Sequence, residues 1–376
     1  MKNIKIAYIG GGSKQWARVF MNDLALCSDL TGEIGLFDID KEAAVRNQQI
    51  GNNINKQPET VSRWNYVVYD SLKEILCGAD FVVISILPGT FEDMRVDVHY
   101  PEKYNIYQSV GDTAGPGGVS RALRTVPFYE EFAAAIEKYC SDAWVINFTN
   151  PMSICTKTLN DVFPSVKAFG CCHEVFHTQD FLCDILEEFT GIKAKRREIY
   201  TEVAGINHFT WISSAKYKDI EIFDFMDDYI AKHFEEGHYE HGPAEKPEVK
   251  KSDEEAVELM RSVLGLTTTI SNVNLPNRGQ ISWLPEGSIV ETNAVFSNDR
   301  VVPVTTKPLP VAVQSLVRRC SDNIDILYEG IKKRDKKIIF ESFVNQPLCS
   351  SLTLDEARSL FDEMYEKNLR FFQKNN

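Results

Sequence analysis

The sequence has no apolar run approaching the roughly 20 residues that a membrane-spanning helix needs. It also lacks the layout of a signal peptide, because MKNIKIAYIG opens directly as a strand. It has too few basic residues for a general nucleic-acid binder, since 41 Lys and Arg stand against 54 Asp and Glu, a net charge of −13. We therefore expect a soluble, cytoplasmic globular protein without nucleic-acid or membrane partners.

A secreted disulfide framework is not expected either. The nine cysteines accompany no export signal, so a reducing compartment with free thiols is the expectation. Internal repeats and low-complexity tracts are absent. With 376 residues and 43% hydrophobic content, the chain suits two globular domains.

Short apolar stretches alternate with helical stretches through the first 170 residues. The predicted strands are 4–9, 34–37, 64–68, 81–87, 144–148 and 166–169. This alternation predicts an α/β fold with a Rossmann-like, doubly wound parallel sheet. Beyond about residue 195 the pattern changes to a β element over 198–216, a loop over 235–252, and helices over 223–234, 254–263 and 311–372. We therefore predict a first domain over 1–195 and a second, α+β domain over 196–376.

A glycine cluster directly follows the first predicted strand and opens a helix. It consists of Gly10, Gly11, Gly12 and Ser13. A pyrophosphate could approach the backbone N–H groups there, at the positive end of the helix. Asp38 ends the second strand, where a carboxylate can accept hydrogen bonds from the ribose hydroxyls of NAD. Asp40 is the competing candidate, with a helix cap as its other role, and a glycine turn without cofactor is the alternative.

Three further segments place polar residues where strands of the sheet should end. They are the GDTAGPGG loop with Asp112, the NFTNPM turn with Asn150, and the GCCHE segment with Cys172 and His173. Ligands in open α/β sheets lie beyond the carboxyl ends of the strands, so these segments should converge. Each could instead be a turn with incidental polar residues.

Cys172 and His173 could be metal ligands, a general acid, or structural. His208 lies in a later polar cluster, GINH, and a thiolate with an imidazole is a plausible partial shell for a divalent transition metal. A structural zinc site would need four protein ligands with close local pairs, and the sequence shows no such set. A metal here should therefore occupy an open catalytic site that substrate oxygens complete.

These motifs, with YIGGGS, FDID and the late NLPNRGQISWLPEGSIVETNAV, resemble glycoside hydrolase family 4, the NAD- and manganese-dependent glycosidases. The resemblance spans nearly the whole chain, and ILPG, QSVGD, GCCHEVF and NHFTWI point to the α-galacturonidase branch. It implies a lactate/malate dehydrogenase-like architecture, an NAD-binding domain over 1–195, and a domain over 196–376 for substrate, metal and oligomerisation. It also implies a homodimer or homotetramer.

The implied mechanism departs from the usual pair of carboxylates. NAD+ removes hydride from C3 of the sugar, a base takes the acidified C2 proton, and the C1–O bond breaks by elimination. Water then adds, and NADH returns the hydride. Mn2+ acts as a Lewis acid on the C2 and C3 oxygens.

The resemblance also implies residue roles. Cys172 and His208 match the metal ligands, His173 the general acid, and Asn150 a substrate contact near the metal. Asp112, a further substrate contact, stands where many members have Glu. Arg95 is a candidate for binding a uronate carboxylate, with a local salt bridge as its alternative.

The chain is short at one place. Family members carry a further segment, with the region of the general base, where HGP at 241–243 here runs almost at once into PEVK at 247–250. Neither Tyr229 nor Tyr239 matches the base. The intact flanks favour a join across missing residues over a natural deletion, and a chain break near 242–247 would distinguish the two.

Three alternative functions stay open. One is a different specificity in the same family: α-glucosidase, α-galactosidase or α-glucuronidase. Another is a 2-hydroxy-acid dehydrogenase, which shares the cofactor fold but would need a His–acid proton relay and no metal thiolate. The last is a non-catalytic NAD-binding regulator, which a true deletion of the base segment would favour.

Overall fold

The computed structural model describes residues 1–233, 249–252 and 254–372. Its strands are β1 (Lys2–Ile9), β2 (Leu30–Phe37), β3 (Trp64–Val68), β4 (Phe81–Ile84), β5 (Trp144–Asn147), β6 (Lys167–Gly170), β7 (Tyr200–Ile206), β8 (Phe209–Tyr217), β9 (Ile220–Glu221), β10 (Thr269–Pro276), β11 (Ile289–Ser297) and β12 (Arg300–Pro303). Its α-helices are α1 (Trp16–Ala25), α2 (Lys41–Ile54), α3 (Leu72–Leu76), α4 (Phe91–His99), α5 (Gly115–Tyr139), α6 (Met152–Val162), α7 (Glu174–Thr190), α8 (Met226–His233), α9 (Ala256–Val263), α10 (Val311–Lys333), α11 (Lys336–Val344) and α12 (Leu354–Phe372).

Six parallel strands form the first part of the sheet, in the order β3-β2-β1-β4-β5-β6. The chain passes to one side of β1 through β2 and β3 and to the other side through β4. The switch in direction therefore opens a crevice at the carboxyl ends of β1 and β4, where ligands of such sheets bind. Every residue of β4 is buried, as expected for a strand covered on both faces. The predicted doubly wound sheet is confirmed.

The sheet continues beyond β6 into the second half of the chain. β10 pairs antiparallel with β6 at Asn274 and Gly170, and β11, β7, β8 and β9 follow in that order. The expected β element over 198–216 is the β7–β8 pair, but β10 and β11 were not anticipated from the sequence. They lie between β6 and β7 in the sheet, so strands from before and after residue 195 form one continuous sheet.

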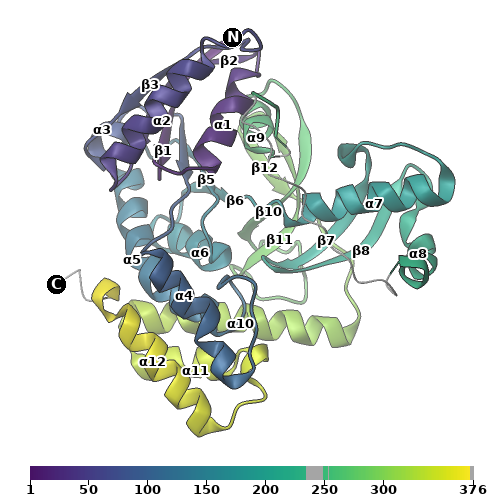
Figure 1. Cartoon of the computed structure of the whole chain (residues 1–376). Helices are drawn as coiled ribbons and strands as arrows, with labels where there is room; N and C mark the ends of the chain where they lie inside the picture. Colours follow the sequence, from purple (N-terminus) through teal and green to yellow (C-terminus); the bar gives the residue numbers. More distant parts are fainter. Residues whose placement is uncertain (234–248, 253, 373–376) are drawn as a thin grey trace.

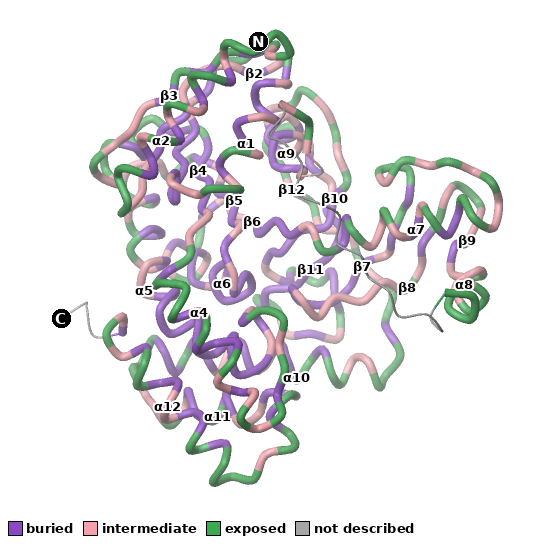
Figure 2. The backbone as a smooth tube through the Cα atoms, in the orientation of Figure 1, coloured by how far each residue is buried: buried purple, intermediate pink, exposed green. Residues whose placement is uncertain are grey.

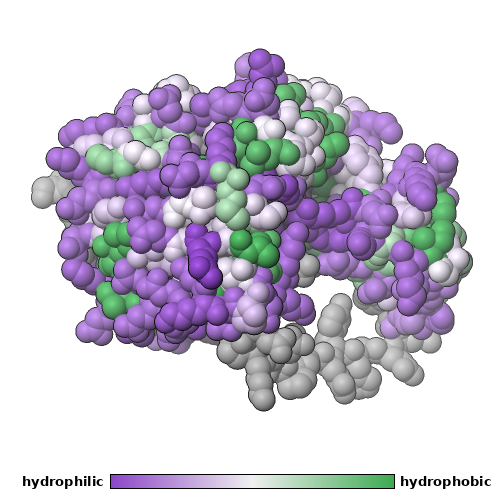
Figure 3. Space-filling view, turned by 90° about the horizontal axis from the view of Figure 1, so that it is seen from above, coloured by the Kyte–Doolittle hydropathy of each residue, from purple (hydrophilic) through white to green (hydrophobic). Residues whose placement is uncertain are grey.

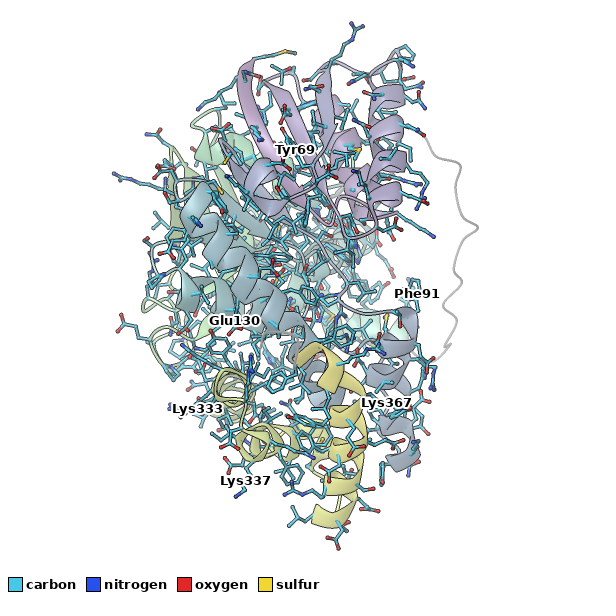
Figure 4. The ribbon with its side chains drawn as sticks, turned by 90° about the vertical axis from the view of Figure 1, so that its left-hand side faces the viewer. Tyr69, Phe91, Glu130, Lys333, Lys337 and Lys367 are labelled. Carbon is cyan, nitrogen blue, oxygen red and sulfur yellow. The ribbon has the colours of Figure 1, made fainter. Side chains whose placement is uncertain are left out.

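The C-terminal helices cover helices from the first half of the chain. Figure 1 shows α10, α11 and α12 beneath α4 and α5, while α7, α8, β7 and β8 project to one side. Apolar residues of α5, including Leu123 and Val126, share one buried cluster with Leu327 of α10 and Phe361 of α12. The tube in Figure 2 is largely purple where these helices meet. Figure 4 shows Glu130 of α5 above Lys333.

The remaining general expectations concern the surface and the cysteines. All nine cysteines are free thiols. Among the described residues, no helix has the length and apolar character needed to cross a membrane. The face seen in Figure 3 is mostly hydrophilic, with hydrophobic side chains in small separate groups. The predicted join near 242–247 and most of the predicted loop over 235–252 lie outside the described residues.

Candidate functional site

A cavity of about 1730 Å³ lies at the carboxyl ends of the parallel strands. Residues from both halves of the chain line it, so residues distant in sequence face one space. The predicted site residues that line it are Gly10, Gly12, Ser13, Asp38, Asp112, Asn150, Cys172, His173 and His208. Gly11 lies just behind this wall, against β2, and Arg95 lies elsewhere. The predicted convergence of the polar segments is therefore what the structure shows.

The glycine loop at one end of the cavity has no room for side chains. Gly10 has φ +94°, and a Cβ there would lie 1.9 Å from the carbonyl oxygen of Ser85. A Cβ on Gly12 would lie 2.7 Å from the Cβ of Ala43. The loop thus presents bare backbone to the cavity, at the start of α1, whose first turn contains no acidic residue. This arrangement can take a phosphate.

The two candidate acids after β2 have different roles. Asp38 Oδ2 accepts the N–H of Gly12 at 2.8 Å, and Oδ1 accepts the N–H of Asp40 at 2.9 Å. Each oxygen keeps a lone pair for a further donor, such as a ribose hydroxyl. Asp40 instead caps α2 by accepting the N–H of Ala43 at 2.9 Å. Asp38 is therefore the carboxylate available to a ligand, and Asp40 takes the alternative role of helix cap.

Sequence reasoning missed Asn47, which holds the glycine loop from behind. This buried side chain of α2 donates from Nδ2 to the carbonyl oxygens of Gly11 and Ser13, both at 2.8 Å. Its Oδ1 accepts from Nε of Arg18 at 3.4 Å. A polar residue in the apolar stripe of a helix is the one sequence feature that could have indicated it.

At the other end of the cavity, three possible metal ligands lie together. Cys172 Sγ lies 3.6 Å from His208 Nε2, and the donor atoms of Cys172, Glu174 and His208 all lie within 4.8 Å of one another. Cys172 and Glu174 stand between β6 and the first turn of α7, whereas His208 occupies the turn between β7 and β8 with φ +57°. Burial, with the charge of Glu291, raises the pKa of the Cys172 thiol to about 12. A metal that binds the thiolate must therefore displace a proton.

A buried polar group supports this cluster from below. Glu291 of β11 is fully buried and accepts from Oγ1 of Thr210 at 2.8 Å and from Nδ2 of Asn272 at 2.9 Å. Burial raises the pKa of Glu291. Asn207, beside His208, accepts from Thr113 at 3.1 Å through Oδ1, and its side chain also interacts with the Cys172 thiol, whose pKa it lowers. The tip of the β7–β8 turn is thus tied to the GDTAGPGG loop.

His173 lies between the two ends of the cavity. Its ring centroid is 5.3 Å from that of Trp16 and 4.7 Å from that of His177, and its Nδ1 is 3.5 Å from a carboxylate oxygen of Glu254. Burial lowers the pKa of His173, and the neighbouring His177 and His208 lower it further. The free protein therefore holds His173 largely neutral at pH 7.

The predicted substrate contacts Asp112 and Asn150 are both held by local partners. Asp112 forms a buried ion pair with Arg121 of α5, which also lines the cavity and was missed from the sequence. Arg121 Nε is buried without a partner in the part of the chain that the structure describes. Asn150 Oδ1 accepts the N–H of Met152 at 3.1 Å, which orients the amide at the start of α6.

Arg95 is the predicted site residue that the structure does not bring to the cavity. It lies on the exposed side of α4, where its Nε and Nη2 donate to the two carboxylate oxygens of Glu92 at 2.8 and 2.7 Å. This is the local salt bridge given as its alternative. The spacing of three residues on one helix makes the pair local, and the residues of α4 that line the cavity are Phe91 and Met94.

The fold and the glycine loop define the class of protein first: a Rossmann-like α/β protein with the architecture of the lactate and malate dehydrogenases. A lactate dehydrogenase from a Medee basin deep-sea metagenome library superimposes with a TM-score of 0.61 at 13% identity, over 88% of this chain and 99% of that one. The likeness at this identity is one of fold alone.

The chain belongs to family 4 of the glycosyl hydrolases. The Family 4 glycosyl hydrolase profile matches residues 5–188, and the Family 4 glycosyl hydrolase C-terminal domain profile matches residues 226–349. An alpha-galacturonidase of Thermoanaerobacter italicus is 42% identical, over 100% of this chain and 98% of the relative. The lplD structure from Bacillus subtilis has a TM-score of 0.90 at 37% identity, covering 97% of this chain and all of that one. The predicted family is confirmed.

Two further comparisons bear on the site. A 6-phospho-beta glucosidase of Thermotoga maritima, solved with manganese, NAD+ and glucose-6-phosphate, has a TM-score of 0.80 at 22% identity, over 98% of this chain and 99% of that one. The alignment with the Thermoanaerobacter italicus relative runs over 451 positions, whereas this chain has 376 residues. That relative therefore carries residues with no counterpart here.

Proposed function

We propose that this chain hydrolyses α-galacturonides with NAD+ and Mn2+ as cofactors. The observation that carries the proposal is the single cavity, which joins a glycine loop and Asp38 at one end to Cys172 and His208 at the other. A dinucleotide at the first end would reach toward a sugar held at the second. The alpha-galacturonidase relatives, at about 40% identity over the full chain, support galacturonic acid as the sugar at the cleaved bond.

The residues present fit a dinucleotide. Gly10 and Gly12 expose backbone where any Cβ would collide, and Asp38 keeps acceptor capacity beside them. A carboxylate at this place favours the 2′-hydroxyl of NAD and repels a 2′-phosphate. When bound, NAD+ supplies the hydride acceptor for C3 of the sugar.

The residues present also fit a divalent metal. Cys172 and His208 offer a sulfur and a nitrogen 3.6 Å apart, which is a separation that two ligands of one ion can have. When bound, Mn2+ supplies Lewis-acid stabilisation of the charge that develops on the sugar oxygens. Glu291 lies buried beside this point, held by hydrogen bonds from Thr210 and Asn272.

The remaining roles belong to side chains along the cavity. His173 would donate a proton to the leaving oxygen, with its ring held beside the Glu254 carboxylate at 3.5 Å. Asn150 would hydrogen-bond the sugar, since Met152 fixes the orientation of its amide. Asp112 would accept a sugar hydroxyl, with Arg121 holding its carboxylate in place.

The division of labour follows the two halves of the chain. We propose that residues 1–195 bind the cofactor and that residues 196–376 contribute to substrate and metal binding and to assembly as a homodimer or homotetramer. The metal site itself takes Cys172 from the first half and His208 from the second. A cytoplasmic location is supported by nine free thiols, which a reducing compartment preserves.

The test is hydrolysis of p-nitrophenyl α-galacturonide, with the α-glucuronide, α-glucoside and α-galactoside as comparisons, in Mn2+, NAD+ and a thiol reductant. We expect the galacturonide to have the highest kcat/KM, with activity requiring NAD+ but producing no net NADH. Cys172→Ser should abolish the metal-dependent activity. A preference for another sugar would contradict the substrate assignment. Net NADH formation on lactate or malate would support a dehydrogenase instead, and a wholly inactive protein that binds NAD+ would support a regulator.

A further inference from the structure

We propose that Glu174 is a third protein ligand of the divalent metal, so that the site is formed by Cys172, Glu174 and His208. This inference rests on the proposed function and deepens it, because it states how the chain binds the metal before any sugar arrives. The resemblance to family 4 implies only the sulfur of Cys172 and the imidazole of His208 as ligands. The Glu174 carboxylate is identified as a candidate ligand only by the structure, which places it beside Cys172 and His208.

The three side chains lie close enough to share one ion. The ligand atoms of Cys172, Glu174 and His208 all lie within 4.8 Å of one another. Metal–ligand bonds of about 2.0–2.3 Å place neighbouring ligand atoms roughly 3–4 Å apart, so a small rotation of the exposed Glu174 side chain completes the arrangement. No other group of three such side chains is found this close in the described ranges.

Two separate segments of the chain build the cluster. Cys172 and Glu174 are two residues apart where β6 passes into α7, so the backbone fixes their relative positions. His208 comes from the turn between β7 and β8, with φ +57°, and β7 pairs with β11 in the sheet. Figure 1 shows α7 beside β7 and β8, which is the packing that closes the cluster.

Glu174 differs from the other glutamates of α7 in its charged neighbours. The other glutamates of α7 that form ion pairs find lysines, as Glu187 does with Lys193 and Glu188 with Lys232. Glu174 has no Lys or Arg partner within the described part of the chain, although it faces the cavity. Once a metal displaces the proton of the Cys172 thiol, the resulting thiolate and this carboxylate repel each other unless the cation lies between them. One divalent ion neutralises both.

The chemistry of the ligand set also suits the proposed ion. Carboxylate oxygen is a ligand that Mn2+ prefers, whereas sulfur and imidazole alone suit zinc and copper better. A third protein ligand leaves the remaining coordination positions toward the cavity, where the two sugar oxygens would bind. We therefore expect the free protein to bind Mn2+ without substrate, with Glu174 contributing to both affinity and selectivity.

The experiment is a titration of the full chain with Mn2+ in the presence of NAD+ and without sugar, with free Mn2+ measured by electron paramagnetic resonance. Glu174→Gln and Glu174→Ala should raise the Kd for Mn2+ at least tenfold. Glu174→Asp, which keeps a carboxylate, should recover part of the loss. Asp184→Asn is the matched control, because Asp184 is an exposed acid of the same helix outside the cavity, and its Kd should stay within twofold.

A second measurement separates ligation from an effect on folding. In the Co2+-substituted protein, the thiolate-to-cobalt absorption band should persist in Glu174→Gln at saturating metal and disappear in Cys172→Ser. Unchanged Mn2+ affinity in Glu174→Gln, together with loss of binding in Cys172→Ser, would overturn the role of Glu174 while leaving the proposed function standing. A wild-type chain that binds no Mn2+ would overturn the metal part of the proposed function, and Glu174 with it.

Discussion

Asn47→Ala should weaken both the folded state and the binding of NAD+. The substitution removes two hydrogen bonds of 2.8 Å to the carbonyl oxygens of Gly11 and Ser13. Each such bond contributes about 1 kcal/mol, and buried acceptors left without a donor add to the loss, so the free energy of unfolding should fall by about 2–3 kcal/mol. Binding of NAD+ must then also order the glycine loop. The Kd for NAD+ rises about tenfold for each 1.4 kcal/mol that this ordering costs.

Asn55→Ala provides the matched control. Asn55 ends the same helix, α2, and also exchanges two backbone hydrogen bonds, donating to the carbonyl oxygen of Trp64 at 2.8 Å and accepting its N–H at 3.1 Å. It lies away from the cavity, so its loss should lower stability and leave the Kd for NAD+ within twofold. Urea unfolding measures the stability of both variants, and quenching of intrinsic fluorescence by NAD+ measures the Kd.

Two outcomes would refute the reasoning about Asn47. If Asn47→Ala unfolds more easily but binds NAD+ as the wild type does, the loop does not depend on this side chain for its shape. If Asn55→Ala weakens NAD+ binding equally, the effect comes from general loss of stability rather than from the loop. Asn47→Asp should be at least as harmful as Asn47→Ala, because it replaces a donor by an acceptor facing two carbonyl oxygens.

Three further predictions concern the packing around the cavity. Burial raises the pKa of Glu291 above its unfolded value of about 4.3. The unfolded chain therefore ionises first, and the free energy of unfolding falls as the pH rises above about 4.3. Glu291→Gln should therefore gain stability over the wild type as the pH rises above about 4.3 in chelator, and a pH-independent difference in urea unfolding would contradict this. Asp97→Asn should cost about 3–5 kcal/mol, because it leaves the fully buried Arg124 without its charged partner. Replacing both members of that pair by apolar residues should cost less in the same assay, and a larger cost would argue against the reasoning. Gly10→Ala should cost at least about 2 kcal/mol in thermal unfolding, because its Cβ would lie 1.9 Å from a backbone carbonyl oxygen. Gly78→Ala also has a positive φ but open space around its Cβ, so an equal loss there would show that backbone strain alone is responsible.

The parallel part of the fold could be predicted because its causes are local. A strand buried on both faces needs a continuous apolar run, and β4 shows one in the sequence and in its burial. The glycine loop could be predicted as well. Only glycine fits there, because a Cβ on Gly10 would collide with the backbone of a neighbouring segment. These features depend on residues next to one another along the chain.

The metal cluster was only partly predictable from local patterns. Cys172 and His208 are 36 residues apart, and the resemblance rather than their spacing linked them. Glu174 stood in the same short segment as Cys172, yet its role depends on the packing of α7 beside β7 and β8. Periodicity describes which residues are buried and says little about which buried surfaces meet.

Arg95 and the β10–β11 pair are features that local sequence patterns did not predict. An arginine in a helix can face a ligand or pair with an acid three residues away, and only the structure shows that Arg95 pairs with Glu92. β10 and β11 complete the sheet through antiparallel pairing with β6 and β7, which unite distant parts of the chain. Local sequence thus specifies strands, turns and their burial, whereas long-range pairing, which no single segment encodes, places Cys172, Glu174 and His208 around one point.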